Sequence, residues 1–126
     1  MIGYVTLGTN DLEKSARYYD ELLSEIGAER FMEDEDHFIA WAVSPNEPAL
    51  SVTKPFDGKA ASVGNGTMVA LMVDGPEKVD ALYNKAISLG GTCEGEPGPR
   101  NEGAFYAGYF RDLDGNKLNA ICVMKP

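Results

Sequence analysis

The sequence predicts an α+β fold in which one β-α-β-β-β module occurs twice. The first observation is internal similarity. Shifting the chain by 64 residues places YVTLGTNDLEKSARYYDELLSEIG, residues 4–27, over MVALMVDGPEKVDALYNKAISLGG, residues 68–91, without a gap. The second is that each copy begins with an alternating strand pattern and continues with apolar residues at helical spacing. The third is that three short strand-like segments follow each predicted helix.

The opening strand of each module alternates between two faces. In the first module, Val5 and Leu7 face one way, whereas Tyr4 and Thr6 face the other. The corresponding segment of the second module, residues 68–73, alternates in the same manner. We expect one face of each strand to pack on its helix and the other to line a cavity between the modules.

The helix of each module has recognisable start and stop signals. Asn10 and Asp74 are the predicted N-caps, and Pro76 falls in the first turn, where its missing N–H costs nothing. Gly27 and Gly90 are predicted to end the two helices, because glycine readily adopts the left-handed conformation of a C-cap.

The remaining strands complete the two modules within a single predicted domain, residues 1–126. The segment KPFDGKAASVGNG is the predicted connector between modules spanning about 1–56 and 66–126. The six remaining predicted strands cover about 28–34, 37–44, 49–54, 92–95, 104–111 and 116–123. Before the last of them, Asp114-Gly115 predicts a turn, and Asn119 falls on the face opposite Leu118 and Ala120.

Composition limits the classes of partner. With 20 acidic and 11 basic residues the net charge is −9, which argues against nucleic acid and against an anionic membrane surface. No apolar run is long enough to span a bilayer, and the first residues do not form a signal peptide. We therefore expect a cytoplasmic protein whose partner is a small molecule or a second copy of itself, and the open strand edges of the modules favour a homodimer.

Three stretches resemble the vicinal oxygen chelate superfamily, which includes glyoxalases, extradiol dioxygenases and bleomycin-resistance proteins. They are GYVTLGTNDLEKSARYYDELL, GNGTMVALMV with its following helix, and PGPRNEGAFYAGYFRDLDGNKLNAICV. Leu113 stands where the last pattern usually has proline. The resemblance implies paired β-α-β-β-β modules, and in the enzymes of the superfamily one divalent metal bound by His and Glu from the first and last strands of each module.

The positions that the resemblance assigns to metal ligands hold other residues in this chain. Tyr4 and Met68 occupy them in the opening strands, and Asn119 occupies the usual Glu position in the last strand. The strand that closes the first module offers only Ser51 or Thr53. Because these groups are poor ligands for a transition metal, we expect no metal and no other cofactor.

The ligand-binding residues are therefore expected to contact an organic molecule rather than a metal ion. Tyr4, Met68, Tyr106 and Asn119 are the predicted lining residues, and two secondary candidates are Trp41 and Arg100. The favoured function is metal-free binding of a small organic molecule, comparable to the antibiotic-sequestering members.

Two other functions remain open. The first is a lyase or isomerase that uses Tyr4, Tyr106 or Glu102 as acid–base groups, or an atypical metal site. The second is a purely structural dimer with a vestigial cavity. The only histidine, His37, lies in an acidic segment and is expected at a solvated hairpin tip.

Overall fold

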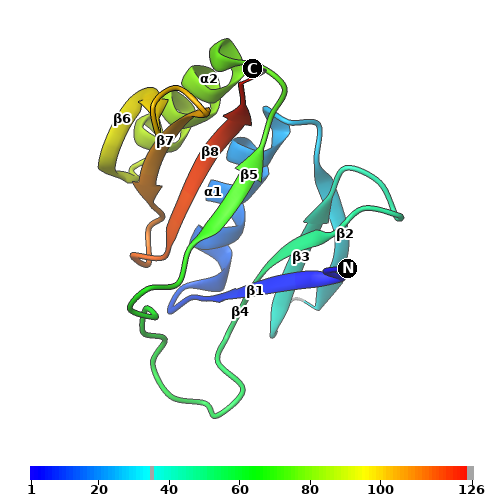
Figure 1. The fold of residues 1–126 in the computed structure, drawn as a ribbon. Helices are drawn as coiled ribbons and strands as arrows, with labels where there is room; N and C mark the ends of the chain where they lie inside the picture. Colours follow the sequence, from blue (N-terminus) through cyan, green and yellow to red (C-terminus); the bar gives the residue numbers. More distant parts are fainter. Residues whose placement is uncertain (35, 125–126) are drawn as a thin grey trace. The chain divides into compact units, whose positions relative to one another are not determined.

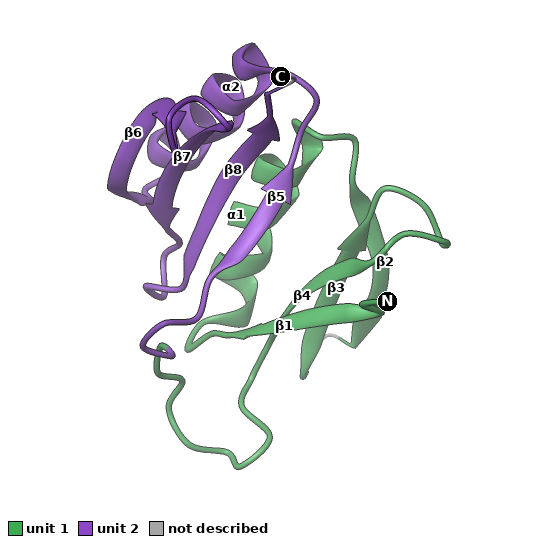
Figure 2. Cartoon of the chain, in the orientation of Figure 1, with its two compact units in different colours: residues 1–63 green, residues 64–126 purple. Residues whose placement is uncertain are grey.

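The computed structural model describes residues 1–34 and 36–124. Within them the chain forms two compact units, residues 1–63 and 64–126, whose boundary falls inside the predicted connector (Figure 2). Each unit contains one helix and one four-stranded sheet in the order β-α-β-β-β (Figure 1). The predicted fold class and the doubling of the module are confirmed.

The first unit contains a sheet, here called sheet 1, with strand order β1-β4-β3-β2. β1 runs parallel to β4, and the other neighbouring pairs are antiparallel. The elements are β1 (Tyr4–Gly8), α1 (Leu12–Ser24), β2 (Glu29–Asp34), β3 (Phe38–Ala42) and β4 (Ala49–Thr53). Glu35, in the middle of the acidic segment near His37, lies outside the described residues.

The second unit repeats this topology in sheet 2, with strand order β5-β8-β7-β6. Its elements are β5 (Val69–Met72), α2 (Pro76–Ser88), β6 (Thr92–Arg100), β7 (Phe105–Arg111) and β8 (Lys117–Val123). β5 is parallel to β8, as β1 is to β4, so the two sheets share one connectivity.

The helices pack on their own sheets through apolar side chains. In the first unit, Tyr19 and Leu22 of α1 and Trp41 and Val52 of sheet 1 are buried. In the second, Val79 and Leu82 of α2, Phe110 of β7 and Leu118 of β8 are buried in the same way. Among them, Leu118 lies on the face of β8 opposite Asn119, as the alternation of the last strand predicts.

The helix starts differ from prediction by one residue each. Asp11, not Asn10, is the N-cap of α1, and its carboxylate accepts a hydrogen bond from the Lys14 N–H at 3.1 Å. α2 begins after Gly75 rather than after Asp74, and Glu77 supplies a negative charge in its first turn.

A further detail of the second unit corrects the sequence predictions. β6 extends to Arg100 instead of ending near residue 95, and it pairs with β7 through register shifts around Gly95. Such bulges let a strand rich in glycine and proline stay paired. Of the two cysteines, Cys93 is exposed and Cys122 is buried.

The turns that flank β7 differ in strain. Gly115 has a φ of +87°, as the predicted Asp-Gly turn requires. Between β6 and β7, however, Asn101 and Glu102 adopt φ values of +50° and +56°, a conformation that is unfavourable for a residue such as glutamate.

Neither helix of the described chain is long and apolar enough to cross a membrane.

Candidate functional site

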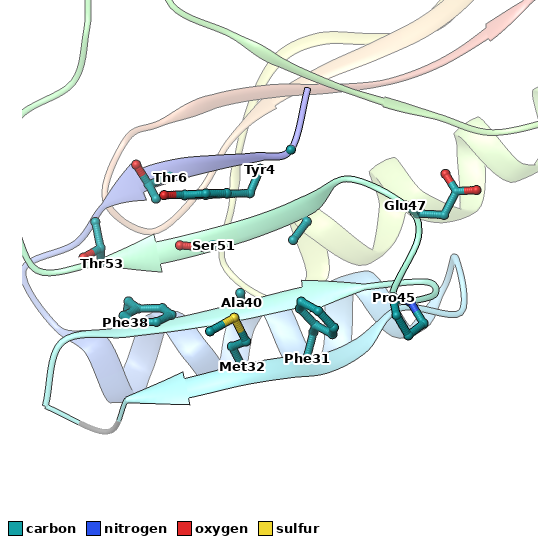
Figure 3. Close-up of a pocket in the computed structure, with 12 residues that line it drawn as sticks. Tyr4, Thr6, Phe31, Met32, Phe38, Ala40, Pro45, Glu47, Ser51 and Thr53 are labelled. Carbon is teal, nitrogen blue, oxygen red and sulfur yellow. The ribbon is translucent and has the colours of Figure 1, made fainter. Parts of the chain in front are cut away.

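A pocket of about 340 Å³ lies on the face of sheet 1 that is turned away from α1 (Figure 3). We call the face of each sheet opposite its own helix the far face. Four bulky side chains supply most of the apolar lining: Tyr4, Phe31, Met32 and Phe38. Tyr4, Met32 and Phe31 keep 69%, 52% and 47% of their surface exposed, which is much for side chains of this kind. The pocket therefore offers an apolar surface of a size suited to a small molecule.

Ser51 lies on the floor of this pocket with an unused hydroxyl group. Its side chain is only 2% exposed, and its Oγ has no hydrogen-bond partner among the described residues. The register places Thr6 and Ala40 on either side of it, and the alanine cannot donate or accept. Thr53, two residues along, donates instead to the His37 and Lys54 carbonyl oxygens at 3.2 and 2.9 Å. Ser51 is thus the buried polar group available to a bound molecule.

Asn119 occupies the corresponding place in the second unit. Thr6 pairs with Ser51 in sheet 1, and Ala70, which matches Thr6 in the 64-residue repeat, pairs with Asn119 in sheet 2. Asn119 is only 1% exposed, and within residues 1–34 and 36–124 its Oδ1 also finds no partner. The two orphaned oxygens therefore stand at equivalent positions of the repeat, one on each far face.

The neighbour of Asn119 on the far face of sheet 2 is an aromatic ring flanked by cations. Tyr109 pairs with Asn119 across β7 and β8. The Arg100 guanidinium carbon lies 5.5 Å from the centre of the Tyr109 ring, and the Lys117 ammonium lies 5.6 Å from it. Arg100 also donates to the Glu96 carbonyl oxygen at 2.7 Å. These contacts hold two cations beside one neutral ring.

Trp41 and Tyr106, both predicted to line the ligand cavity, lie on the helix faces of their sheets. The Trp41 Nε1–H donates to Asp20 of α1 at 2.9 Å, and the Tyr106 hydroxyl donates to Asp80 of α2 at 2.8 Å. Arg30, through its hydrogen bond, lowers the pKa of Asp20, and the Trp41 bond acts in the same direction. The bond to Asp80 raises the pKa of Tyr106. Both aromatic side chains serve the packing of a helix on its sheet.

The other predicted residues are distributed over both units. Tyr4 lines the pocket of sheet 1 together with Ser51, and Arg100 lies over the ring of Tyr109, which pairs with Asn119 across β7 and β8. Met68 directly precedes β5 and is 41% exposed. That Tyr4, Met68 and Asn119 line one cavity stays a prediction.

Several lining residues of the sheet 1 pocket were missed by the sequence analysis. They are Thr6, Phe31, Met32, Phe38, Ala40, Pro45, Glu47 and Ala49. Alternation placed Thr6 on the face of Tyr4 without naming it as a lining residue, and alternation from Ser51 could have found Ala49. Glu47 could not be found in this way, because it lies in the loop between β3 and β4.

Comparison with known proteins agrees with the geometry of the repeat. The sequence pattern of the Glyoxalase/Bleomycin resistance protein/Dioxygenase superfamily matches residues 1–120. The chain belongs to this superfamily. A glyoxalase/bleomycin resistance protein from Albidiferax ferrireducens T118 is 35% identical, with a TM-score of 0.87, and the match covers 100% of this chain and 99% of that one.

Other solved structures are similar at lower identity. A hypothetical protein from S. aureus is 25% identical, with a TM-score of 0.75 over 97% of this chain and 92% of that one. A lactoylglutathione lyase from Agrobacterium tumefaciens has a TM-score of 0.73 over the same shares at 17% identity, which shows the fold alone. A search of curated proteins finds no match.

The residues of the chain do not fit the divalent metal that the superfamily implies. In the part of the chain that the structure describes, no three His, Cys, Asp or Glu side chains group so that they could hold a metal ion. The register also decides between the two candidates in β4, since Ser51 matches Asn119 whereas Thr53 does not. The four corresponding positions are thus a phenol, a hydroxyl, a thioether and an amide, which are weak ligands for Zn²⁺ or Ni²⁺.

Proposed function

We propose that this member of the superfamily binds a small organic molecule in the pocket of sheet 1 and does so without a catalytic metal. The observation that carries the proposal is the buried Ser51 hydroxyl, which has no partner within the described chain, on the floor of a largely apolar pocket. Leaving such a group unsatisfied costs about 1–3 kcal/mol, which a ligand that hydrogen-bonds to it would recover.

Binding is favoured over lyase or isomerase chemistry because two of the three predicted acid–base groups, Tyr106 and Glu102, do not line the pocket. Tyr106 is engaged by Asp80, and its raised pKa makes it a poor base near neutral pH. Glu102 lies at the tip of the β6–β7 turn rather than in the pocket. The homodimer and the cytoplasmic location that the sequence predicts remain part of this proposal.

A titration followed by NMR tests the proposal. We expect 2-phenylethanol, a neutral molecule of suitable size, to shift the amide signals of Ser51 and Phe38 in the ¹⁵N-labelled protein. Thr6→Trp should abolish these shifts, because the indole would fill the pocket from an exposed position. Thr92→Trp is the matched control, since Thr92 is an exposed strand residue outside the pocket.

Two results would contradict the proposal. The first is that the signals of Ser51 and Phe38 do not respond to 2-phenylethanol or to its charged analogues. The second is that titration calorimetry of the unmodified protein shows tight, stoichiometric uptake of Zn²⁺ or Ni²⁺, which would mean that the chain assembles a metal site from other donors.

A further inference from the structure

The pocket of sheet 1 has a charge character of its own. Of the described residues that line it, Glu47 alone carries a charged side chain. Glu47 and Pro45 lie at one end of the pocket, on the loop between β3 and β4, and Phe38 and Thr53 lie at the other (Figure 3). An anionic ligand would therefore meet a carboxylate and, among the described lining residues, no compensating cation.

The aromatic lining of the pocket also favours a cation over an anion. Tyr4, Phe31 and Phe38 come from three different strands, and all three line the pocket. The face of an aromatic ring carries negative potential and attracts an ammonium group placed over it. The net charge of −9 strengthens the attraction of a cation from solution at low ionic strength.

The floor of the pocket requires a hydrogen-bonding group in the ligand. Ser51 is more than nine-tenths buried, and no described residue bonds to its Oγ. A hydroxyl oxygen can accept a hydrogen bond from an N–H or O–H group. A protonated amine provides such an N–H and, unlike a carboxylate, is attracted by both the carboxylate of Glu47 and the aromatic rings.

We propose that the pocket of sheet 1 selects an apolar amine that is protonated at neutral pH. In this arrangement an ammonium N–H donates to Ser51 Oγ, and the aliphatic or aromatic body lies against Tyr4, Phe31, Met32 and Phe38. Glu47 supplies the negative charge at the end of the pocket. The inference rests on the proposed function, because it names the class of ligand for the same pocket.

Three probes of nearly equal size and different charge test the inference. They are phenethylammonium, 2-phenylethanol and phenylacetate, each titrated at low salt while the amide signals of Ser51 and Phe38 are followed. We expect phenethylammonium to bind about fivefold more tightly than 2-phenylethanol, and phenylacetate to bind most weakly. The preference should shrink at high salt, because screening weakens the attraction of exposed charges.

Two substitutions separate the contributions of charge and hydrogen bond. Glu47→Gln should reduce the preference for the cation at low salt, whereas Glu25→Gln, which changes the net charge equally at an exposed site outside the pocket, should leave it unchanged. Ser51→Ala should weaken phenethylammonium binding about two- to tenfold, as expected for the loss of one hydrogen bond.

The possible failures are distinct. If none of the three probes shifts Ser51 and Phe38, the proposed function itself is wrong. If 2-phenylethanol or phenylacetate binds as tightly as phenethylammonium, the pocket binds small molecules but does not select amines, and only this inference is overturned.

Discussion

The far faces of sheet 1 and sheet 2 share a register but differ in chemistry. Each carries one buried oxygen that lacks a partner among the described residues, Ser51 in one and Asn119 in the other. Around Ser51 lie apolar side chains and the carboxylate of Glu47. Beside Asn119 lies Tyr109, flanked by two cations. A duplicated module can thus keep its backbone geometry while its two far faces acquire side chains of opposite charge.

The two oxygens without hydrogen-bond partners lower the stability of both modules. Buried polar groups normally find partners, and the two exceptions fall at equivalent positions of the repeat. Sites that bind ligands often keep such groups at the expense of stability. The comparison therefore predicts that removing either oxygen should stabilise the protein, whereas truncating a side chain that packs in the core should destabilise it.

The largest effect is expected for Asn119→Leu. Replacing the buried amide by an apolar group of similar size should raise the free energy of unfolding by about 1–3 kcal/mol, measured by urea denaturation. Asn116→Leu is the control, because Asn116 is also buried but its side chain donates to Asp112 at 3.0 Å. A loss of stability in Asn119→Leu, like the loss expected for Asn116→Leu, would mean that the amide is not orphaned in solution.

A smaller effect of the same sign is expected for Ser51→Ala. Removal of the unpartnered hydroxyl should raise the free energy of unfolding by about 1 kcal/mol. Thr53→Val should have the opposite effect, since its hydroxyl donates to two carbonyl oxygens. Chemical denaturation of both variants measures these free energies of unfolding. A destabilised Ser51→Ala variant would mean that the Ser51 hydroxyl, unlike the Asn119 amide oxygen, has a partner in solution.

The smallest effect concerns the cations beside Tyr109. Tyr109→Leu should lower the free energy of unfolding by about 0.5–1 kcal/mol at low salt, because the contacts with Arg100 and Lys117 are lost. Tyr109→Phe keeps the ring and should be nearly neutral. Thermal denaturation of both variants measures these changes. Equal effects of leucine and phenylalanine on the free energy of unfolding would contradict the contrast between the two far faces.

Strand alternation placed a side chain on the correct face where the two faces of a strand were chemically distinct. At the start of β8, the polar Lys117 and Asn119 alternate with the apolar Leu118 and Ala120, so Asn119 was placed correctly on the face opposite Leu118 and Ala120. In β7, Phe105 and Tyr109 fall on one face and Tyr106 and Phe110 on the other. Alternation alone could not choose between these faces, and Tyr106 was assigned to the wrong one.

Trp41 was misplaced for the same reason. In β3, Phe38 and Ala40 occupy one face and Ile39 and Trp41 the other, and all four are apolar. The hydrogen bond from Trp41 to Asp20 of α1 identifies the helix face, and its donor and acceptor lie 21 residues apart in sequence. No local pattern predicts a contact of that range.

The sequence by itself determined the doubled module and the alternation of its strands. These features depend on residue identity and on spacing along the chain, which local rules describe. Only the tertiary structure decided that Ser51 rather than Thr53 matches Asn119, that both oxygens lack partners in the described chain, and that Glu47 joins the pocket. Strand register and hydrogen-bond satisfaction depend on which distant segments pair, and a one-residue change of register turns every side chain to the other face.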